Sequence, residues 1–214
     1  CDGREGLTLQ IASMFVSGIT IAMTLFLNAA GLTLLFGVLR ILNFAQGTFI
    51  MLGAYVAAMF LAQTAFGPGY FLLIGLVGGC AVGLIGLVID LLVFRRLRHV
   101  DEAVALIATF ALMIAVQGAV KLVFGSNFIS ISPPSSLDGA FFLGRLIVPQ
   151  FSVFAIAVGI LVFVALELLL TRMWLGKVVR SVASNAWIMS VFGYDTRRYV
   201  MIAVGLSFFL AGFA

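Results

Sequence analysis

Unbroken apolar runs constrain the fold of this chain more than any other feature. A helix needs about 20 apolar residues to cross the hydrocarbon core of a bilayer. In lipid, only a helix satisfies its backbone hydrogen bonds within one segment. Membrane-spanning strands would instead alternate apolar and polar residues, and these runs do not alternate. The runs therefore predict an all-α polytopic transmembrane helical bundle, with helices over residues 11–36, 47–66, 70–94, 103–124, 151–170 and from about 199 onward.

Charge is scarce along the whole chain. Hydrophobic residues make up 64% of the 214 residues and charged residues 9%, whereas about 25% of an average soluble domain is charged. These values exclude a soluble domain and a disordered chain. The 12 lysines and arginines are dispersed among loops, so they form no nucleic-acid-binding face. We expect residues 1–214 to form a single transmembrane domain in the lipid bilayer. Because the last run is still apolar at Ala214, we expect the chain to be truncated within that span.

The sequence shows no pattern of catalytic or metal-binding residues. Its two cysteines, Cys1 and Cys80, lie far apart, which excludes the usual redox and zinc motifs. The phosphate-binding motif GxxxxGK[ST] is absent, because Gly176-Lys177 lacks the preceding glycine and the following hydroxyl residue. We therefore expect a chain that is not an enzyme and holds no metal or cofactor of its own.

Two clusters of basic residues predict the topology. One lies at 95–98 and the other within 172–198, and the positive-inside rule places both loops in the cytoplasm. Two spans separate the loops, which agrees with a common side. If 47–66 crosses the membrane fully, the N-terminus lies outside. Residues 125–146 contain two prolines and several turn-forming residues, which predict an external loop.

Glycines and carboxylates within the spans also carry information. Gly75, Gly79 and Gly83 recur every four residues, so they share one helix face and predict close helix packing.

Asp90 and Glu167 each precede an arginine by five residues near a cytoplasmic span end. They are either interfacial carboxylates that pair with that arginine or a proton or ion site.

The segment from Arg40 to Gly47 places a charge, two amides and a glycine between two apolar runs. Polar backbone and amides at such a break are tolerated in a membrane where they line a cavity. The alternative is a plain interfacial turn in which Asn43 or Gln46 caps a helix end. The spacing of these residues leaves both interpretations open.

The second basic loop contains a short helix signal. Ser184 or Asn185 can cap a helix over 186–192, and Gly193 is well placed to end it. The helix would present large apolar side chains in a basic loop outside the spans, namely Trp187, Ile188, Val191 and Phe192. An exposed apolar helix there requires either a protein partner or the lipid headgroup layer.

The stretch from Gly31 to Tyr55 resembles the permeases of branched-chain amino acid ABC importers. That family has an Asn-Phe-Ala-His-Gly signature followed by Met-Leu-Gly-Ala-Tyr, and this chain has Asn-Phe-Ala-Gln-Gly and Met-Leu-Gly-Ala-Tyr. Gln46 departs from the common histidine, and an amide can form hydrogen bonds but cannot titrate. The resemblance implies that the translocation pathway is lined by Asn43, Phe44, Gln46 and Gly47.

The stretch from Gly176 to Arg198 is similar to the cytoplasmic loop that docks on the ATPase subunit in this family. Ser181 and Met189 stand where alanine is usual. The resemblance implies that residues 171–198 form a coupling loop whose key positions are Gly176, Lys177, Arg180, Ala183, Asn185 and Gly193.

Taken over nearly the whole chain, the resemblance implies a multi-pass permease subunit of an ATP-driven importer for branched-chain amino acids in the bacterial inner membrane. Its partners would be a second permease (in a homodimer or a heterodimer), two ATPase subunits that bind ATP and Mg²⁺, and an extracytoplasmic substrate-binding protein. The alternatives are a urea or short-amide ABC permease, an ion-coupled secondary transporter that uses Asp90 and Glu167, and a passive channel for a small neutral solute.

Overall fold

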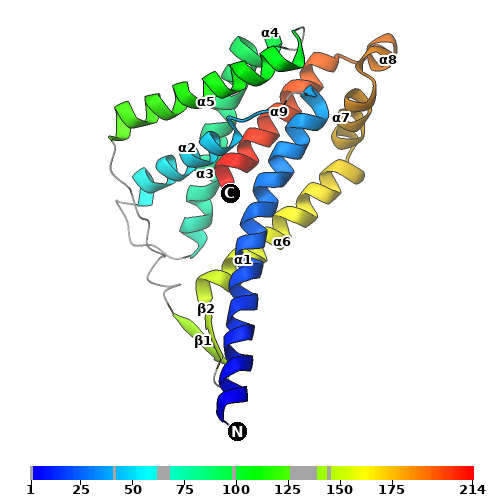
Figure 1. The fold of residues 1–214 in the computed structure, drawn as a ribbon. Helices are drawn as coiled ribbons and strands as arrows, with labels where there is room; N and C mark the ends of the chain where they lie inside the picture. The colour runs from blue at the N-terminus through cyan, green and yellow to red at the C-terminus, as the bar shows by residue number, and fades with distance from the viewer. Residues whose placement is uncertain (1, 41, 62–67, 98–99, 126–138, 144–145) are drawn as a thin grey trace.

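The computed structural model describes residues 2–40, 42–61, 68–97, 100–125, 139–143 and 146–214. Side chains are described except those of residues 2–10, 61, 68, 142–143 and 146–147. Figure 1 shows a bundle of long helices with a small hairpin near the N-terminal end of the first helix. In chain order the elements are α1 (Asp2–Leu39), α2 (Gln46–Leu61), α3 (Pro68–Ile89), the π-helix η1 (Asp90–Phe94), α4 (Arg95–Leu97), α5 (Glu102–Phe124), β1 (Ala140–Leu143), β2 (Leu146–Pro149), α6 (Gln150–Thr171), α7 (Trp174–Ser184), α8 (Ala186–Val191) and α9 (Thr196–Phe213).

The apolar runs form helices, as predicted. Among the described residues, five helical segments are long and apolar enough to cross a membrane: Ile11–Leu39, Gly69–Leu97, Glu102–Phe124, Gln150–Thr171 and Thr196–Phe213. The helix α2 has only 16 residues, which gives a length of about 24 Å. It is therefore shorter than the roughly 30 Å hydrocarbon core. Residues 62–66 of the predicted second span lie outside the described residues.

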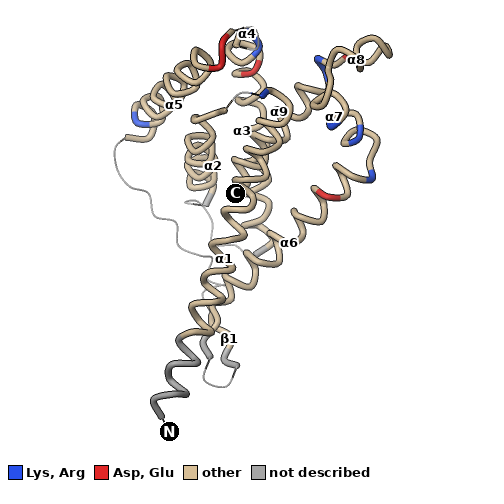
Figure 2. Tube along the Cα trace, turned by 45° about the vertical axis from the view of Figure 1, so that its right-hand side comes forward, with Lys and Arg blue, Asp and Glu red and all other residues tan. Residues whose placement is uncertain are grey.

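The two basic loops lie at the same end of the bundle. Figure 2 shows Lys and Arg residues gathered around α4, α7 and α8, and Figure 1 shows that α1 begins at the opposite end. This arrangement agrees with the common side that the positive-inside rule predicts for the two loops.

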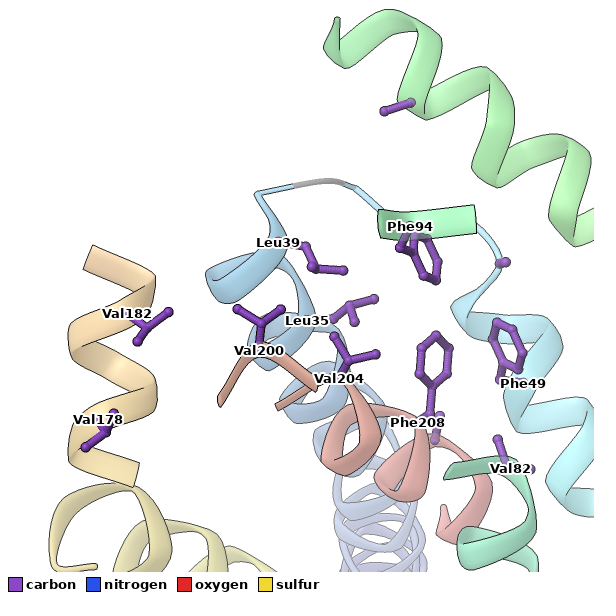
Figure 3. Packing of buried hydrophobic residues seen from close by; sticks show 13 residues of the cluster. Leu35, Leu39, Phe49, Val82, Phe94, Val178, Val182, Val200, Val204 and Phe208 are labelled. Carbon is purple, nitrogen blue, oxygen red and sulfur yellow. The ribbon is translucent and has the colours of Figure 1, made fainter. Parts of the chain in front are cut away.

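The helix α9 is at the centre of the packing, where it contacts α1, α2, α3 and α7. Its Phe208 is fully buried, and the ring centroid lies 4.4 Å from that of Phe49 and 6.1 Å from that of Phe94. Figure 3 shows these three rings together, with Val204 and Leu35 beside them. The core thus joins α1, α2, η1 and α9.

The glycine stripe of α3 faces α9, which confirms the predicted packing role. A Cβ at Gly79 would lie 2.9 Å from the carbonyl oxygen of Phe209, and one at Gly83 would lie 3.4 Å from that of Gly205. The absence of side chains at these positions lets the two backbones approach each other.

The prediction of a loop over residues 125–146 is wrong for its last residues. Residues 126–138 lie outside the described part, but β1 and β2 form an antiparallel hairpin in which Ala140 pairs with Pro149 and Phe141 with Val148. Both strands are short and rich in aromatic and β-branched residues, which favour strands. Strands of four residues are too short to stand out as apolar runs of membrane-spanning length.

Candidate functional site

The helix α1 ends at Leu39 because the backbone of Arg40 turns into the left-handed region, with φ of 54°. The Arg40 amide still donates to the carbonyl oxygen of Phe36 at 2.8 Å. Among the described residues, Arg40 is the only non-glycine with a positive φ. A left-handed conformation costs an L-residue about 1–2 kcal/mol, so something must hold Arg40 in place.

Asn43 forms the turn that begins α2. Its Oδ1 accepts a hydrogen bond from the amide of Ala45 at 3.1 Å, and its carbonyl oxygen accepts one from the amide of Gln46 at 3.3 Å. A side-chain oxygen that binds the backbone two residues ahead is typical of an Asx turn. This contact supports the interpretation of Asn43 as a residue that organises a helix start.

The same segment buries polar atoms that have no partner in the described structure. Asn43 is 4% exposed and Gln46 5% exposed, and Thr48 is buried beside them. The buried atoms that have no hydrogen-bond partner are Asn43 Nδ2, both side-chain polar atoms of Gln46, Thr48 Oγ1 and, on α1, Asn28 Oδ1. An unsatisfied buried polar group costs about 1–3 kcal/mol. The break is therefore both a turn and a source of unpaired donors and acceptors inside the bundle.

The amide of Gln46 lies where α1, α2 and α9 meet. A Cβ at Gly31 would lie 3.1 Å from Gln46 Nε2 and 3.0 Å from the carbonyl oxygen of Ser207. Ser207 is fully buried, and its Oγ donates to the carbonyl oxygen of Gly31 at 2.6 Å. Ser207 was not among the predicted site residues, although a lone serine within the last apolar run was the available signal.

Phe44 and Gly47 occupy the outer side of the break. Phe44 is 57% exposed, and Gly47 is exposed with no atom within 4 Å of where its Cβ would lie. The structure therefore turns Asn43 and Gln46 inward and Phe44 and Gly47 outward. On the side of α5, the Oγ1 of Thr109 donates to the carbonyl oxygen of Leu42 at 3.3 Å.

The helix α7 is amphipathic and packs on the bundle through its apolar face. Val178, Val179 and Val182 are buried, whereas Lys177 and Arg180 are exposed. Gly176 is also buried, and a Cβ there would collide with the backbone of Leu169 and Leu170 at the end of α6. Gly176 thus allows α7 to fold back against α6.

The helix α8 forms as predicted and ends one residue earlier than expected. Of the two candidate caps, Asn185 is the one that acts, since its Oδ1 accepts from the amide of Ile188 at 3.2 Å. Gly193 follows the helix with φ of 80°. The exposed apolar side chains of α8 are Trp187 (75% exposed), Ile188 and Val191, and Phe192 is exposed directly after the helix.

Arg40 links the break between α1 and α2 to the loop 171–198. Its Nη2 donates to the carbonyl oxygens of Ala183 at 3.3 Å and Ser184 at 3.0 Å, at the C-terminal end of α7. Ala183 itself is half-buried. The sequence analysis did not anticipate this contact, because 143 residues separate Arg40 from Ala183.

The two carboxylates within the spans lie in different environments. Asp90 is 2% exposed and starts the π-helical turn η1, whereas Glu167 is exposed on α6. π-Helical turns are frequent at functional sites. Within the described residues, no group of three or more His, Cys, Asp or Glu side chains could hold a metal ion.

Comparison with known proteins identifies the family. Residues 14–214 match the family described as the branched-chain amino acid transport system permease component. The chain belongs to this permease family. Together with the membrane-length helices, this makes it a multi-pass membrane protein.

Three relatives illustrate the similarity. The chain is 26% identical over 204 residues to the high-affinity branched-chain amino acid transport system permease protein LivH of Escherichia coli, which covers 91% of this chain and 66% of that protein. It is 25% identical over 209 residues to the corresponding protein BraD of Pseudomonas aeruginosa, covering 93% and 67%. It is 31% identical over 202 residues to a probable LivH of Methanocaldococcus jannaschii, covering 89% and 60%. The permease thus spans about two thirds of the length of these relatives, and no solved structure matches it.

Proposed function

We propose that this chain is a permease subunit of an ATP-driven importer of branched-chain amino acids in a bacterial inner membrane. It works with a second permease subunit, two ATPase subunits and an extracytoplasmic substrate-binding protein. The ATPase subunits bind ATP and Mg²⁺, and the permease catalyses no bond chemistry. The family and the names of its relatives support the transported class.

The observation that carries the coupling proposal is the surface of α8. Its large apolar side chains are exposed at the basic end of the bundle. Exposed apolar clusters of this kind mark protein contact sites. We assign the ATPase contact to the loop 171–198, with Lys177 and Arg180 on the exposed face of α7 and with Asn185 and Gly193 bounding α8.

The packing of α7 supplies a route for mechanical coupling. ATP binding closes the ATPase subunits and moves α8, and α7 moves with it because the two helices are joined at Asn185. The buried face of α7, including Gly176 and Val182, contacts α1, α6 and α9. Movement of the loop therefore tilts the helices that enclose the break. ATP can shift this equilibrium only through the conformation that its binding favours.

The translocation pathway runs along the break at Asn43, Phe44, Gln46 and Gly47. The unpaired amide atoms of Asn43 and Gln46 are stabilised when the break opens to water or to a polar solute, because burial without a partner is unfavourable. Gln46 offers both a donor and an acceptor without a titrating group. The pathway therefore presents uncharged polar groups to the solute.

A substitution on α8 and one in the other basic loop test the ATPase contact. Trp187 lies on α8, whereas Val100 lies just before α5 and outside residues 171–198, and both are exposed at the same end of the bundle. We expect Trp187→Glu to abolish substrate-stimulated ATP hydrolysis and uptake in vesicles, because it places a carboxylate in an apolar interface. The control Val100→Glu should retain both activities.

Co-purification of the ATPase subunits distinguishes the alternatives. Loss of the ATPase from the Trp187→Glu variant is the expected result. If that variant retains the ATPase and full uptake, α8 is not the contact. If lipid alone shields position 187 from solvent when the ATPase is absent, α8 lies in the headgroup layer instead.

A further inference from the structure

Arg40 holds the C-terminal end of α7. The last carbonyl groups of a helix have no partner within the helix and carry a partial negative charge. Arg40 Nη2 donates to two successive carbonyl oxygens of this kind, those of Ala183 and Ser184. A guanidinium presents several donors in a fixed plane and is always charged, which suits it to such a position.

The contact lies directly beside the junction of α7 and α8. Asn185 has an extended backbone, with φ of −151° and ψ of 93°, and caps α8 with its side chain. Movement of α8 relative to α7 therefore acts on Asn185, which directly follows the two residues that Arg40 binds. Among the hydrogen bonds of the described residues, only those of Arg40 connect α7 or α8 to α1 or the break.

The backbone of Arg40 lies at the start of the break. Its φ of 54° ends α1, and Asn43 follows three residues later. Glycine would adopt this conformation without strain, so the backbone alone gives no reason for an arginine at this position. The two hydrogen bonds of its side chain are the compensation that the structure offers for the strain.

There is also room beside the break for it to move. An open groove of about 650 Å³ is lined by Leu39, Arg40 and Leu42 on one side and by Glu102 and Leu106 on the other. A shift of Arg40 toward or away from this groove changes the turn that leads to Asn43.

We propose that Arg40 is a positioning residue that transmits movement of the α7–α8 junction to the break at Asn43–Gly47, and so couples ATP hydrolysis to transport. This inference rests on the proposed function. Arg40 contacts neither the ATPase nor the solute in this scheme. It acts by tying the C-terminal carbonyls of α7 to the residue from which the break begins.

The test uses the complete transporter, with its ATPase subunits and binding protein, in vesicles that allow uptake and ATP hydrolysis to be measured together. We expect Arg40→Gly to assemble normally, because it relieves the left-handed backbone. The number of amino-acid molecules taken up per ATP should fall about fivefold or more, the lower end of a typical coupling interaction. Arg40→Lys should restore part of the ratio because an ammonium group also donates to carbonyls.

Arg96→Gln is the matched control, since Arg96 is exposed on α4 at the same end of the bundle. It should leave the ratio of uptake to hydrolysis unchanged. Should Arg40→Gly fail to assemble, Arg40→Met carries the test, because it removes the charge and every side-chain donor but keeps a long side chain. A wild-type ratio in the variant that assembles overturns the role of Arg40.

The failure of this inference is distinguishable from failure of the proposed function. If the wild-type transporter shows no ATP-driven uptake, the proposed function is wrong. If the wild type is driven by ATP and the Arg40 variants keep its ratio, only the role of Arg40 is wrong. An equal loss of uptake and hydrolysis, with the ratio unchanged, also overturns it, because that result indicates a purely structural residue.

Discussion

Gly53 lies where α2 crosses α9 most closely, and its replacement by alanine gives a sharp test of the packing. A Cβ at Gly53 would lie 2.6 Å from Gly212 Cα and 2.9 Å from the carbonyl carbon of Gly212. Gly78 of α3 borders the same crossing, since a Cβ there would lie 3.4 Å from the carbonyl oxygens of both Gly53 and Gly212. Three helix backbones therefore meet at glycines.

The expected loss of stability follows from these distances. Carbon atoms pack at about 3.5–4.0 Å, so Gly53→Ala requires α2 to move about 1 Å away from α9. The opposing atoms belong to backbone, which cannot rotate out of the way. Overpacking costs about 1–3 kcal/mol, and alanine recovers about 0.5–1 kcal/mol of helix propensity. We expect a net loss of about 1–2 kcal/mol.

Thermal unfolding of the purified permease in detergent measures this loss. A change of that size lowers the melting temperature by about 2–8 °C in a domain of this length. Gly37→Ala on α1 is the matched control, because no atom lies within 4 Å of the position of its Cβ. We expect that variant to be slightly stabilised. If Gly53→Ala and Gly37→Ala melt at the same temperature, the close crossing of α2 and α9 is wrong.

Two further substitutions test the break and the α8 cap. Asn43→Leu should lower uptake while the permease still assembles with its ATPase, because an amide is lost from the pathway, and uptake equal to wild type would contradict that role. Asn185→Ala should remove about 1 kcal/mol from α8, and so speed amide hydrogen exchange at Ile188 about fivefold. Ser184→Ala, which removes a side chain that does not cap α8, should leave the exchange rate at Ile188 unchanged.

The elements that could be predicted from the sequence are those set by local physics. Long apolar runs become helices because a segment in lipid must satisfy its own backbone hydrogen bonds. The bounds of α8 follow from Asn185, which binds an amide three residues ahead, and from Gly193, which adopts a positive φ. Gly75, Gly79 and Gly83 share one face because residues four apart lie on the same side of a helix, whereas their contact with α9 is a result of packing. The short β-hairpin was not predicted because its strands are too short to stand out as separate runs.

The sequence by itself therefore determined the helices, the basic end of the bundle and the capped helix of the second basic loop, since each depends on neighbours within a few residues. Only the tertiary structure decided that Gln46 lies inside beside Gly31 while Phe44 lies outside, and that Ser207 binds α1. It also decided that Arg40 reaches Ser184, 144 residues away. Such contacts depend on how rigid helices pack against one another, and no local pattern in the chain encodes their register.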